Sequence, residues 1–187
     1  MSAFYFGKGT VMQKLIHEFK YKANKELGEF LGTIMGELLL QTDRFKNIDA
    51  VIPLPLFAAK EYKRGFNQAT ILCNGISKAM NIPVVKNNVT RKRFTETQTK
   101  KHRTERWENV SGSFEIINPD LITGKHILLV DDVITTGATL EACGTEILKI
   151  KETKLSIATL GAIVVIKFNS SNSGNCFRRF LFDCIQV

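Results

Sequence analysis

The sequence predicts an α/β domain with a mostly parallel central sheet flanked by helices. Short apolar segments of strand length alternate along the chain with longer segments that have helical periodicity. One strand candidate, HILLV (126–130), is apolar at nearly every position, as expected for a parallel strand covered on both faces. The length of 187 residues suits one compact domain.

The N-terminal half is predicted to begin with two helices. Thr10 can cap a helix through VMQKLIHEFKYK, and Asn24 begins a second helix with one apolar stripe. IDAVIP (48–53) is predicted to be a buried strand closed by proline, and a polar loop follows over 53–65. The next helix runs from about Asn67 to Met80.

The C-terminal half continues the alternation. IPVV (82–85) is predicted to be a second strand, and Phe114–Ile117 an edge strand. After HILLV, a helix is expected over Leu140–Ile150 and a further buried strand over SIATLGAIVVI (156–166). We interpret His126, at the start of HILLV, as structural.

These elements divide the chain into a helical N-terminal segment (1–47), an α/β core (48–166) and a tail of unassigned role (167–187). No stretch approaches the ~20 apolar residues of a membrane helix, and the N-terminus lacks a secretory apolar region. We therefore expect a cytoplasmic protein without membrane insertion. Neither a disulfide framework nor a zinc site is expected from the spacing of the four cysteines: Cys73, Cys143, Cys176 and Cys184.

The positive charge is concentrated in one segment. The chain has a net charge of +8, and Lys86–Arg106 contains eight Lys and Arg against two Glu. This segment is polar and has no apolar stripe, so we expect an open loop without ligand. A solvated face, a nucleic-acid contact and a clamp for a polyphosphate all remain open from the charge alone.

The most informative stretch is ILLVDDVITTGAT (127–139). Burying two adjacent unpaired carboxylates would cost several kcal/mol, so Asp131 and Asp132 are placed at the carboxyl end of the strand, where parallel sheets bind ligands. The small residues that follow can form an anion site at the start of the next helix: Thr135, Thr136, Gly137, Ala138 and Thr139. An anion site beside two hydrogen-bond acceptors suits a sugar phosphate.

This stretch allows other interpretations. Paired acids at a strand end can hold magnesium, and Thr136 or Thr139 can serve only as a helix N-cap. A Walker phosphate loop is excluded because no GKS or GKT occurs, and no GxGxxG follows any predicted strand.

ILLVDDVITTGAT resembles the signature of the type I phosphoribosyltransferases, whose acids and Thr/Gly loop bind the ribose 5-phosphate of phosphoribosyl pyrophosphate (PRPP). Within that superfamily the chain is most similar to the ComF proteins. Three further segments carry this resemblance: LIHEFKYKANKELGEFLG (15–32), VIPLPLFAAKEYKRGFNQA (51–69) and TETQTKKHRTERWENVSGSF (95–114). The four-cysteine zinc ribbon common in that family has no counterpart before Ala3, so we expect a naturally short or a truncated member.

The resemblance implies the type I phosphoribosyltransferase fold with a small helical N-terminal hood, and it implies site roles. Asp131 and Asp132 would hold the ribose hydroxyls and Mg²⁺, the ion being bound largely through the ligand. Thr135 through Thr139 would wrap the 5-phosphate. The pyrophosphate-binding positions would be Lys63, Arg64 and Gly65. The basic segment would be the flexible catalytic loop, with catalytic positions at Gln98, Arg106 and Asn109.

The implied reaction is displacement of pyrophosphate from C1 of PRPP by a nitrogen nucleophile on an unknown acceptor. One alternative is a PRPP-sensing protein without turnover. Another is a competence factor that binds single-stranded DNA beside a DNA-uptake helicase, with Phe66, Phe94 and Trp107 as base-stacking platforms. A homodimer is a further candidate assembly.

Overall fold

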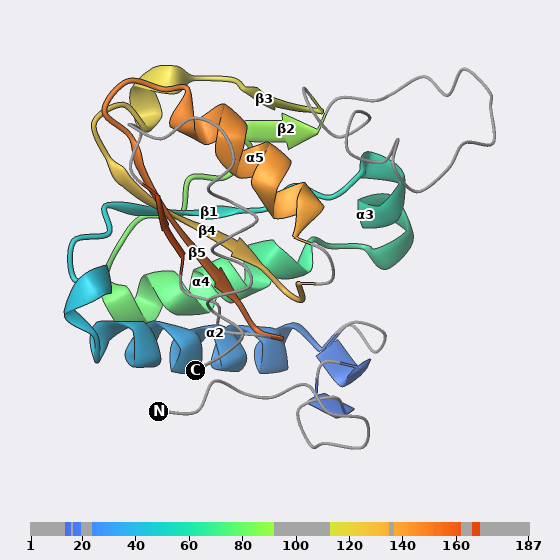
Figure 1. The fold of residues 1–187 in the computed structure, drawn as a ribbon. Helices are drawn as coiled ribbons and strands as arrows, with labels where there is room; N and C mark the ends of the chain where they lie inside the picture. The colour runs from blue at the N-terminus through green and yellow to red at the C-terminus, as the bar shows by residue number, and fades with distance from the viewer. Residues whose placement is uncertain are drawn as a thin grey trace.

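The structure, a computed structural model, has an α/β fold built on a central sheet (Figure 1). In the described residues the sheet has the order β1-β4-β5-β6: β1 is Ala50–Pro53, β4 His126–Asp131, β5 Lys154–Thr159 and β6 Ile166–Phe168. β1, β4 and β5 are parallel, and β6 is antiparallel to β5. The predicted fold class is confirmed. The structure describes residues 14–15, 17–19, 24–91, 113–134, 137–161 and, as backbone, 166–168.

The central strand β4 is covered on both faces. Leu128 and Val130 belong to one apolar cluster, and Ile127 and Leu129 belong to another. All four side chains are inaccessible to solvent. Because successive residues of a strand point to opposite faces, this double covering explains why the segment is apolar without alternation.

Two helices cover one face of the sheet in two layers. α4 (Gln68–Met80) packs on β1 and β4, and α2 (Lys25–Leu40) packs on the far side of α4 (Figure 1). Both begin where predicted, and Asn24 and Asn67 are their N-caps: each side chain accepts a hydrogen bond from a backbone N–H group in the first helical turn. Both predicted helix starts are confirmed.

The contact between α2 and α4 depends on glycine. A Cβ atom at Gly75 of α4 would overlap the carbonyl oxygen of Glu29, and one at Gly32 of α2 would overlap that of Leu72. The helices therefore approach closely, backbone against backbone. α2 carries its glycines four residues apart, which places them on one face: Gly28, Gly32 and Gly36.

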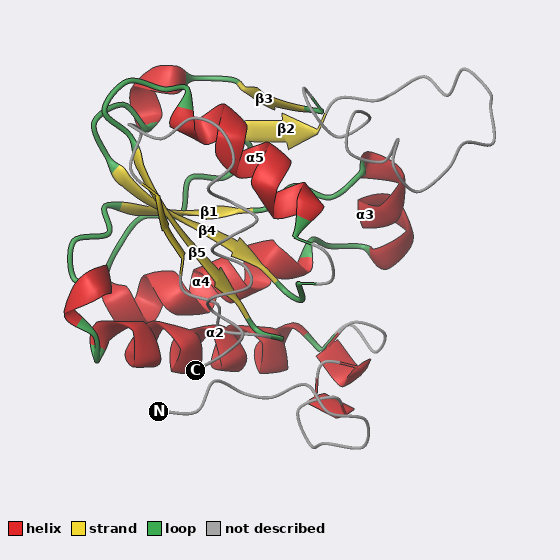
Figure 2. Cartoon of the chain, in the orientation of Figure 1, coloured by secondary structure: helices red, strands yellow, loops and turns green. Residues whose placement is uncertain are grey.

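The other face of the sheet carries α5 (Ala138–Leu148) and a two-stranded ribbon (Figure 2). The ribbon pairs β2 (Val89–Arg91) antiparallel with β3 (Phe114–Ile116), and α5 packs against β3. β3 confirms the predicted edge strand. The prediction that the basic segment is a loop from Lys86 onward is wrong, because buried Val89 anchors its first part as β2.

The prediction of a polar loop over 53–65 is also wrong, since this segment contains a short helix, α3 (Ala58–Arg64). None of the α3 side chains is buried, so the segment has no apolar stripe by which to recognise a helix. Gly65 ends the helix with a φ of 77°, and its N–H donates to the Glu61 carbonyl at 2.7 Å.

Two predicted strands are shorter than expected. In the segment 82–85, Val84 forms only an isolated parallel bridge to Val51, because Pro83 has no N–H to donate to a ladder. The strand predicted over 156–166 is not continuous: β5 ends at Thr159, and β6 returns antiparallel from Ile166.

The remaining elements agree with the sequence or lie partly outside the described residues. Of the helix predicted after Thr10, only 14–15 and 17–19 are described, and these are helical. His126 is buried, and its ring nitrogens lie 3.1 Å from the Asn47 carbonyl oxygen and 2.9 Å from the Ser156 hydroxyl, which confirms a structural role. The division of the chain at 47/48 and 166/167 stays a prediction. In the described part of the chain, every helix is too short or too polar to cross a membrane.

Candidate functional site

The carboxyl edge of the sheet brings together two described segments with predicted site residues, one after β1 and one after β4 (Figure 1). β1 and β4 are parallel neighbours and end at this edge. The chain leaves β1 toward α3 and α4, and it leaves β4 toward α5, so both α4 and α5 begin here. Parallel sheets bind ligands at this edge, where helix N-termini and strand ends meet.

The acidic pair lies where the sequence predicts. Asp131 is the last residue of β4, paired in register with Thr159, and Asp132 follows it directly. Both are partly exposed. The Asp132 N–H donates to the Asp131 carboxylate at 2.8 Å, and the Gly161 N–H donates to the Asp132 carbonyl at 2.9 Å. The backbone of the pair is therefore tied to the residues that follow β5.

The loop after the pair leads into α5 through Gly137, which has a φ of 75° and stands at the N-cap. Ala138 begins the helix, and Thr139 lies in its first turn. Gly137 provides no side-chain cap, so the first amides of α5 depend on another acceptor. Thr135 and Thr136 lie outside the described residues.

The loop after β1 is fastened beside β4. The Leu54 N–H donates to the Val130 carbonyl at 2.8 Å, and the Asn67 side-chain amide donates to the Leu54 carbonyl at 3.0 Å. Three predicted pyrophosphate-binding residues occupy the end of α3 within this loop: Lys63, Arg64 and Gly65. The Arg64 guanidinium donates to the Gln68 side chain at 2.9 Å, which connects α3 to the first residue of α4.

Arg91, at the end of β2, is a residue that sequence reasoning missed. Its guanidinium carbon lies 3.6 Å from the ring centroid of Phe57 and 5.3 Å from that of Phe114. Burial lowers the pKa of Arg91, while Cys143 and Asp131 act in the opposite direction. In the sequence, Arg91 differs from the other cations of the basic segment only in following two β-branched residues, Val89 and Thr90.

The other predictions have mixed outcomes. The proposed catalytic positions lie outside the described residues: Gln98, Arg106 and Asn109. The same holds for two of the three aromatic platforms, Phe94 and Trp107. Phe66 is wrong as a platform because it is 8% exposed and packs against Phe19 at a centroid separation of 6.1 Å.

Binding of Mg²⁺ requires a suitable set of oxygen donors. Among the described residues, no group of three or more His, Cys, Asp and Glu side chains is arranged to hold a metal ion. Magnesium commonly uses only one or two protein carboxylates and takes its other oxygens from substrate phosphates and water. The paired carboxylates of Asp131 and Asp132 fit that mode of binding.

A family model, the phosphoribosyl transferase domain, matches residues 63–172. The chain belongs to this family. The matched range includes the end of α3, the acidic pair and the start of α5, and it begins after β1. Within the phosphoribosyl transferase family, the chain is a member of the ComF group.

The chain is similar to several curated proteins. It is 30% identical over 132 residues to "DNA utilization protein YhgH" of Escherichia coli K12, covering 69% of this chain and 57% of that protein. It is 36% identical over 101 residues to "Competence protein F" of Haemophilus influenzae, covering 54% and 44%. To "Competence protein ComFC" of Bacillus subtilis it is 28% identical, covering 70% and 50%. The chain thus spans about half the length of these relatives.

Solved structures agree on the fold. The allosteric regulatory enzyme of purine biosynthesis superposes with a TM-score of 0.53 at 14% identity, covering 90% of this chain and 37% of that one. Glutamine PRPP amidotransferase from B. subtilis gives a TM-score of 0.52 at 15% identity, covering 90% and 38%. These likenesses support the phosphoribosyltransferase fold.

Proposed function

We propose that the chain binds magnesium-PRPP and transfers its phosphoribosyl group to a nitrogen nucleophile, releasing pyrophosphate. The observation that carries the proposal is the carboxyl edge itself. There, two partly exposed aspartates precede the glycine-capped start of α5, and the loop that contains the cationic end of α3 is fastened beside the same strand. Such an arrangement offers acceptors for a diol and donors for phosphates.

The acidic pair and the start of α5 suit the sugar end of the ligand. Asp131 and Asp132 would accept hydrogen bonds from the ribose hydroxyls. The first amides of α5 would donate to the 5-phosphate, because the positive end of a helix with unsatisfied N–H groups favours an anion. The conformation of Gly137 lets this phosphate approach the backbone closely.

The end of α3 suits the leaving group. Lys63 and Arg64 provide positive charge in the loop after β1, and the hydrogen bond to Gln68 orients the Arg64 guanidinium. Charge that develops on departing pyrophosphate is stabilised by cations fixed in advance. Mg²⁺, when bound, would neutralise part of that charge, held by the ligand oxygens and the acidic pair.

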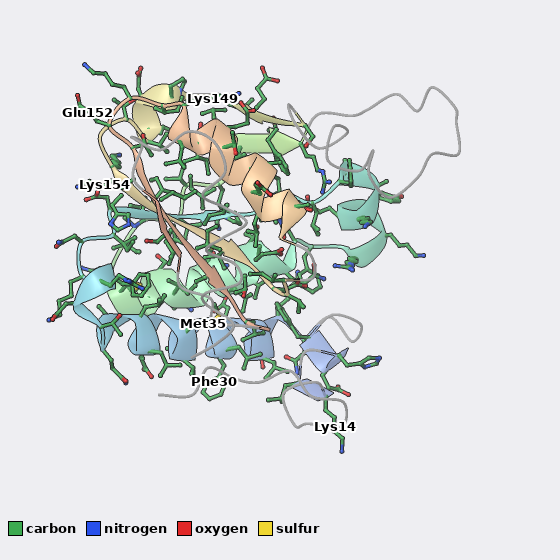
Figure 3. All side chains as sticks on the ribbon, viewed as in Figure 1. Lys14, Phe30, Met35, Lys149, Glu152 and Lys154 are labelled. Carbon is green, nitrogen blue, oxygen red and sulfur yellow. The ribbon has the colours of Figure 1, made fainter. Side chains whose placement is uncertain are left out.

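Calorimetric titration with magnesium-PRPP tests the binding step. Asp131→Asn with Asp132→Asn should weaken binding at least tenfold, since hydrogen bonds to charged groups contribute about 1.5–3 kcal/mol each. The control is Asp120→Asn with Glu152→Gln, which removes the same charge at the opposite edge of the sheet, where Figure 3 labels Glu152. Equal affinity of the two double variants would contradict the assignment.

Release of pyrophosphate tests turnover. We expect release from magnesium-PRPP to require a nitrogen acceptor, to be found by screening ammonia, amines and nucleobases. Binding of magnesium-PRPP without release across that panel would instead support the PRPP-sensing function. The proposed location for either function is the cytoplasm.

A second candidate function is supported by the surface of α3. Tyr62 is 92% exposed and is surrounded in sequence by Lys60, Lys63 and Arg64. Exposed aromatic rings among cations stack on the bases of single-stranded nucleic acid, and relatives of this chain are named for DNA utilization and competence. Binding of a mixed-sequence DNA single strand should weaken with salt, and Tyr62→Ala should reduce it about 5- to 150-fold. Unchanged binding by Tyr62→Ala would exclude this surface.

A further inference from the structure

The outward side of α2 carries an apolar stripe. Phe30, Ile34 and Leu38 follow one another at a spacing of four residues, which places them on one side of the helix. Phe30 is 62% exposed, and Ile34 and Leu38 are partly exposed. In Figure 3, Phe30 lies on the side of α2 away from α4, whereas buried Met35 lies on the side toward it. We call the three outward residues the α2 stripe.

The α2 stripe takes no part in the core formed by the described residues. Neither of the two apolar clusters in the described ranges includes Phe30, Ile34 or Leu38. α2 packs on α4 through a different side, where Gly32 lies against the Leu72 backbone. Single apolar side chains on a surface are common, but three in a row along one helix side are typical of a surface that another segment covers.

Negative charge borders the α2 stripe. Glu26 precedes Phe30 by four residues and Glu37 follows it by seven, so both lie on the same side of the helix as Phe30. Both are exposed, and neither forms an ion pair with another residue of the described part. An occupant that combines an apolar face with positive charge would therefore complement this surface.

The sequence CFRRFLFDCIQV (176–187) has both properties. Five of its apolar residues recur at the spacing of one helix face: Phe177, Phe180, Leu181, Cys184 and Ile185. Arg178 borders this face, Arg179 follows it, and the only acid of the segment is Asp183. The pattern predicts an amphipathic helix with a net positive charge.

The end of β6 places this segment within reach of α2. β6 is antiparallel to β5, and its last residue, Phe168, pairs with Leu155 near the start of β5. The chain therefore leaves β6 at the amino edge of the sheet, where the parallel strands begin. α2 ends toward the same edge, because the 3-10 helix η1 (Asp43–Phe45) carries the chain from α2 to the start of β1. Residues 169–175 can span about 23–25 Å, and α2 is about 24 Å long.

We propose that residues 176–187 pack as a helix on the α2 stripe of the same chain. The apolar faces of the two helices exclude water from one another, which supplies the main driving force. Arg178 lies toward Glu26 and Glu37, and these exposed charges set the orientation of the segment more than its affinity. The contact lies on the side of α2 away from α4, so it does not depend on whether PRPP occupies the carboxyl edge.

A disulfide trap in the full-length protein tests the contact. Glu37→Cys places a thiol beside the α2 stripe and leaves its three apolar residues unchanged. With copper phenanthroline as oxidant, we expect a disulfide to Cys176 or Cys184, because the packing brings Cα atoms within about 7 Å. Cys73 and Cys143 are buried and do not compete. Mass spectrometry of peptides from the non-reduced protein identifies the pair.

The matched control is Glu61→Cys, which makes the same substitution at an exposed residue of α3. It should form about tenfold less of such a disulfide, or none. Equal amounts in the two variants, or no disulfide in either, would overturn the proposal. An equal mixture of isotope-labelled and unlabelled protein separates links within a chain from links between chains. A disulfide found only between chains would show that a second copy covers the stripe and would also contradict the proposal.

Limited proteolysis provides a test that needs no added cysteine. Phe30→Glu should release the segment, so trypsin should cut after Arg178 or Arg179 about tenfold faster than in the wild type. Tyr62→Glu, at an exposed aromatic residue of α3, should leave that rate unchanged. Circular dichroism checks folding, and Ile34→Gln replaces Phe30→Glu if the latter does not fold. A wild type that is cut as fast as the stripe variants would overturn the proposal.

Discussion

Gly75→Ala should destabilise the protein by separating α2 from α4. The new Cβ would overlap the Glu29 carbonyl oxygen and would lie 2.6 Å from Thr33 N and 2.8 Å from Gly32 C. All three are backbone atoms, so no side-chain rotation can relieve the contact. Overpacking in a core costs typically about 1–3 kcal/mol, and we expect the upper end here because a helix must move.

The intrinsic helix preference of alanine over glycine offsets about 1 kcal/mol of that cost. The net loss in the free energy of unfolding should therefore be about 2 kcal/mol. For a chain of this length, 1 kcal/mol shifts the melting temperature by about 2–4 °C, so we expect a decrease of about 4–8 °C. Urea and thermal unfolding, followed by circular dichroism, measure both quantities.

Gly144→Ala is the matched control. It makes the same substitution within α5, but the new Cβ meets only the Cδ2 atom of Leu155, at 2.8 Å. A leucine methyl can move, so this variant should lie between neutral and about 1 kcal/mol more stable. If Gly75→Ala were as stable as Gly144→Ala, the backbone contact between α2 and α4 would not limit their approach, and the reasoning would be refuted.

Three further predictions concern single residues. Cys73 and Cys143 should resist iodoacetamide in the native protein and react after denaturation, because burial raises the pKa of both thiols; mass spectrometry of the labelled peptides checks this, and native labelling would contradict it. The ion pair with Lys78 lowers the pKa of Glu29 below its ordinary value of 4.5. An exposed pair of this kind stabilises the fold by about 0.2–1 kcal/mol. This stabilisation is present above the ordinary pKa and is lost as the pH falls through the lowered pKa. The stability difference between wild type and Lys78→Met should thus be present at pH 7 and shrink at pH 3 in urea unfolding; a difference that grows in acid would refute the assignment. Asn67→Ala should cost about 1–3 kcal/mol, since it removes the N-cap of α4 and the bond to the carbonyl after β1, and a neutral result in urea unfolding would show that neither bond stabilises the fold.

The parts of the fold that the sequence predicts are those with strong local signals. The uninterrupted apolar run of β4 indicates a doubly covered strand, and the single apolar stripe after Asn24 indicates a helix, α2. β2 and its pairing with β3 were not predictable, because β2 has only three residues and β3 lies beyond a long stretch of chain. α3 was missed because its side chains are exposed, which leaves no periodic pattern.

In the candidate site, too, the residues with a strong local signal were predictable and those that depend on distant contacts were not. Charge fixes the location of Asp131 and Asp132, since two adjacent carboxylates cannot be buried in the sheet. Arg91 could not be predicted, because its position depends on contact with Phe57, which is distant in sequence. Phe66 was misjudged for a related reason: its burial depends on Phe19, and composition does not show that contact.

Thermal unfolding with magnesium-PRPP and with ribose tests the central claim most directly. At a ligand concentration of 100 times Kd, binding to the native state adds about 2.7 kcal/mol, which for this length is about 5–11 °C in Tm. We predict that increase for magnesium-PRPP and none for ribose, because the start of α5 and the cations of α3 need phosphate groups. Equal stabilisation by both ligands, or by neither, would contradict the assignment of the carboxyl edge as a phosphoribosyl site.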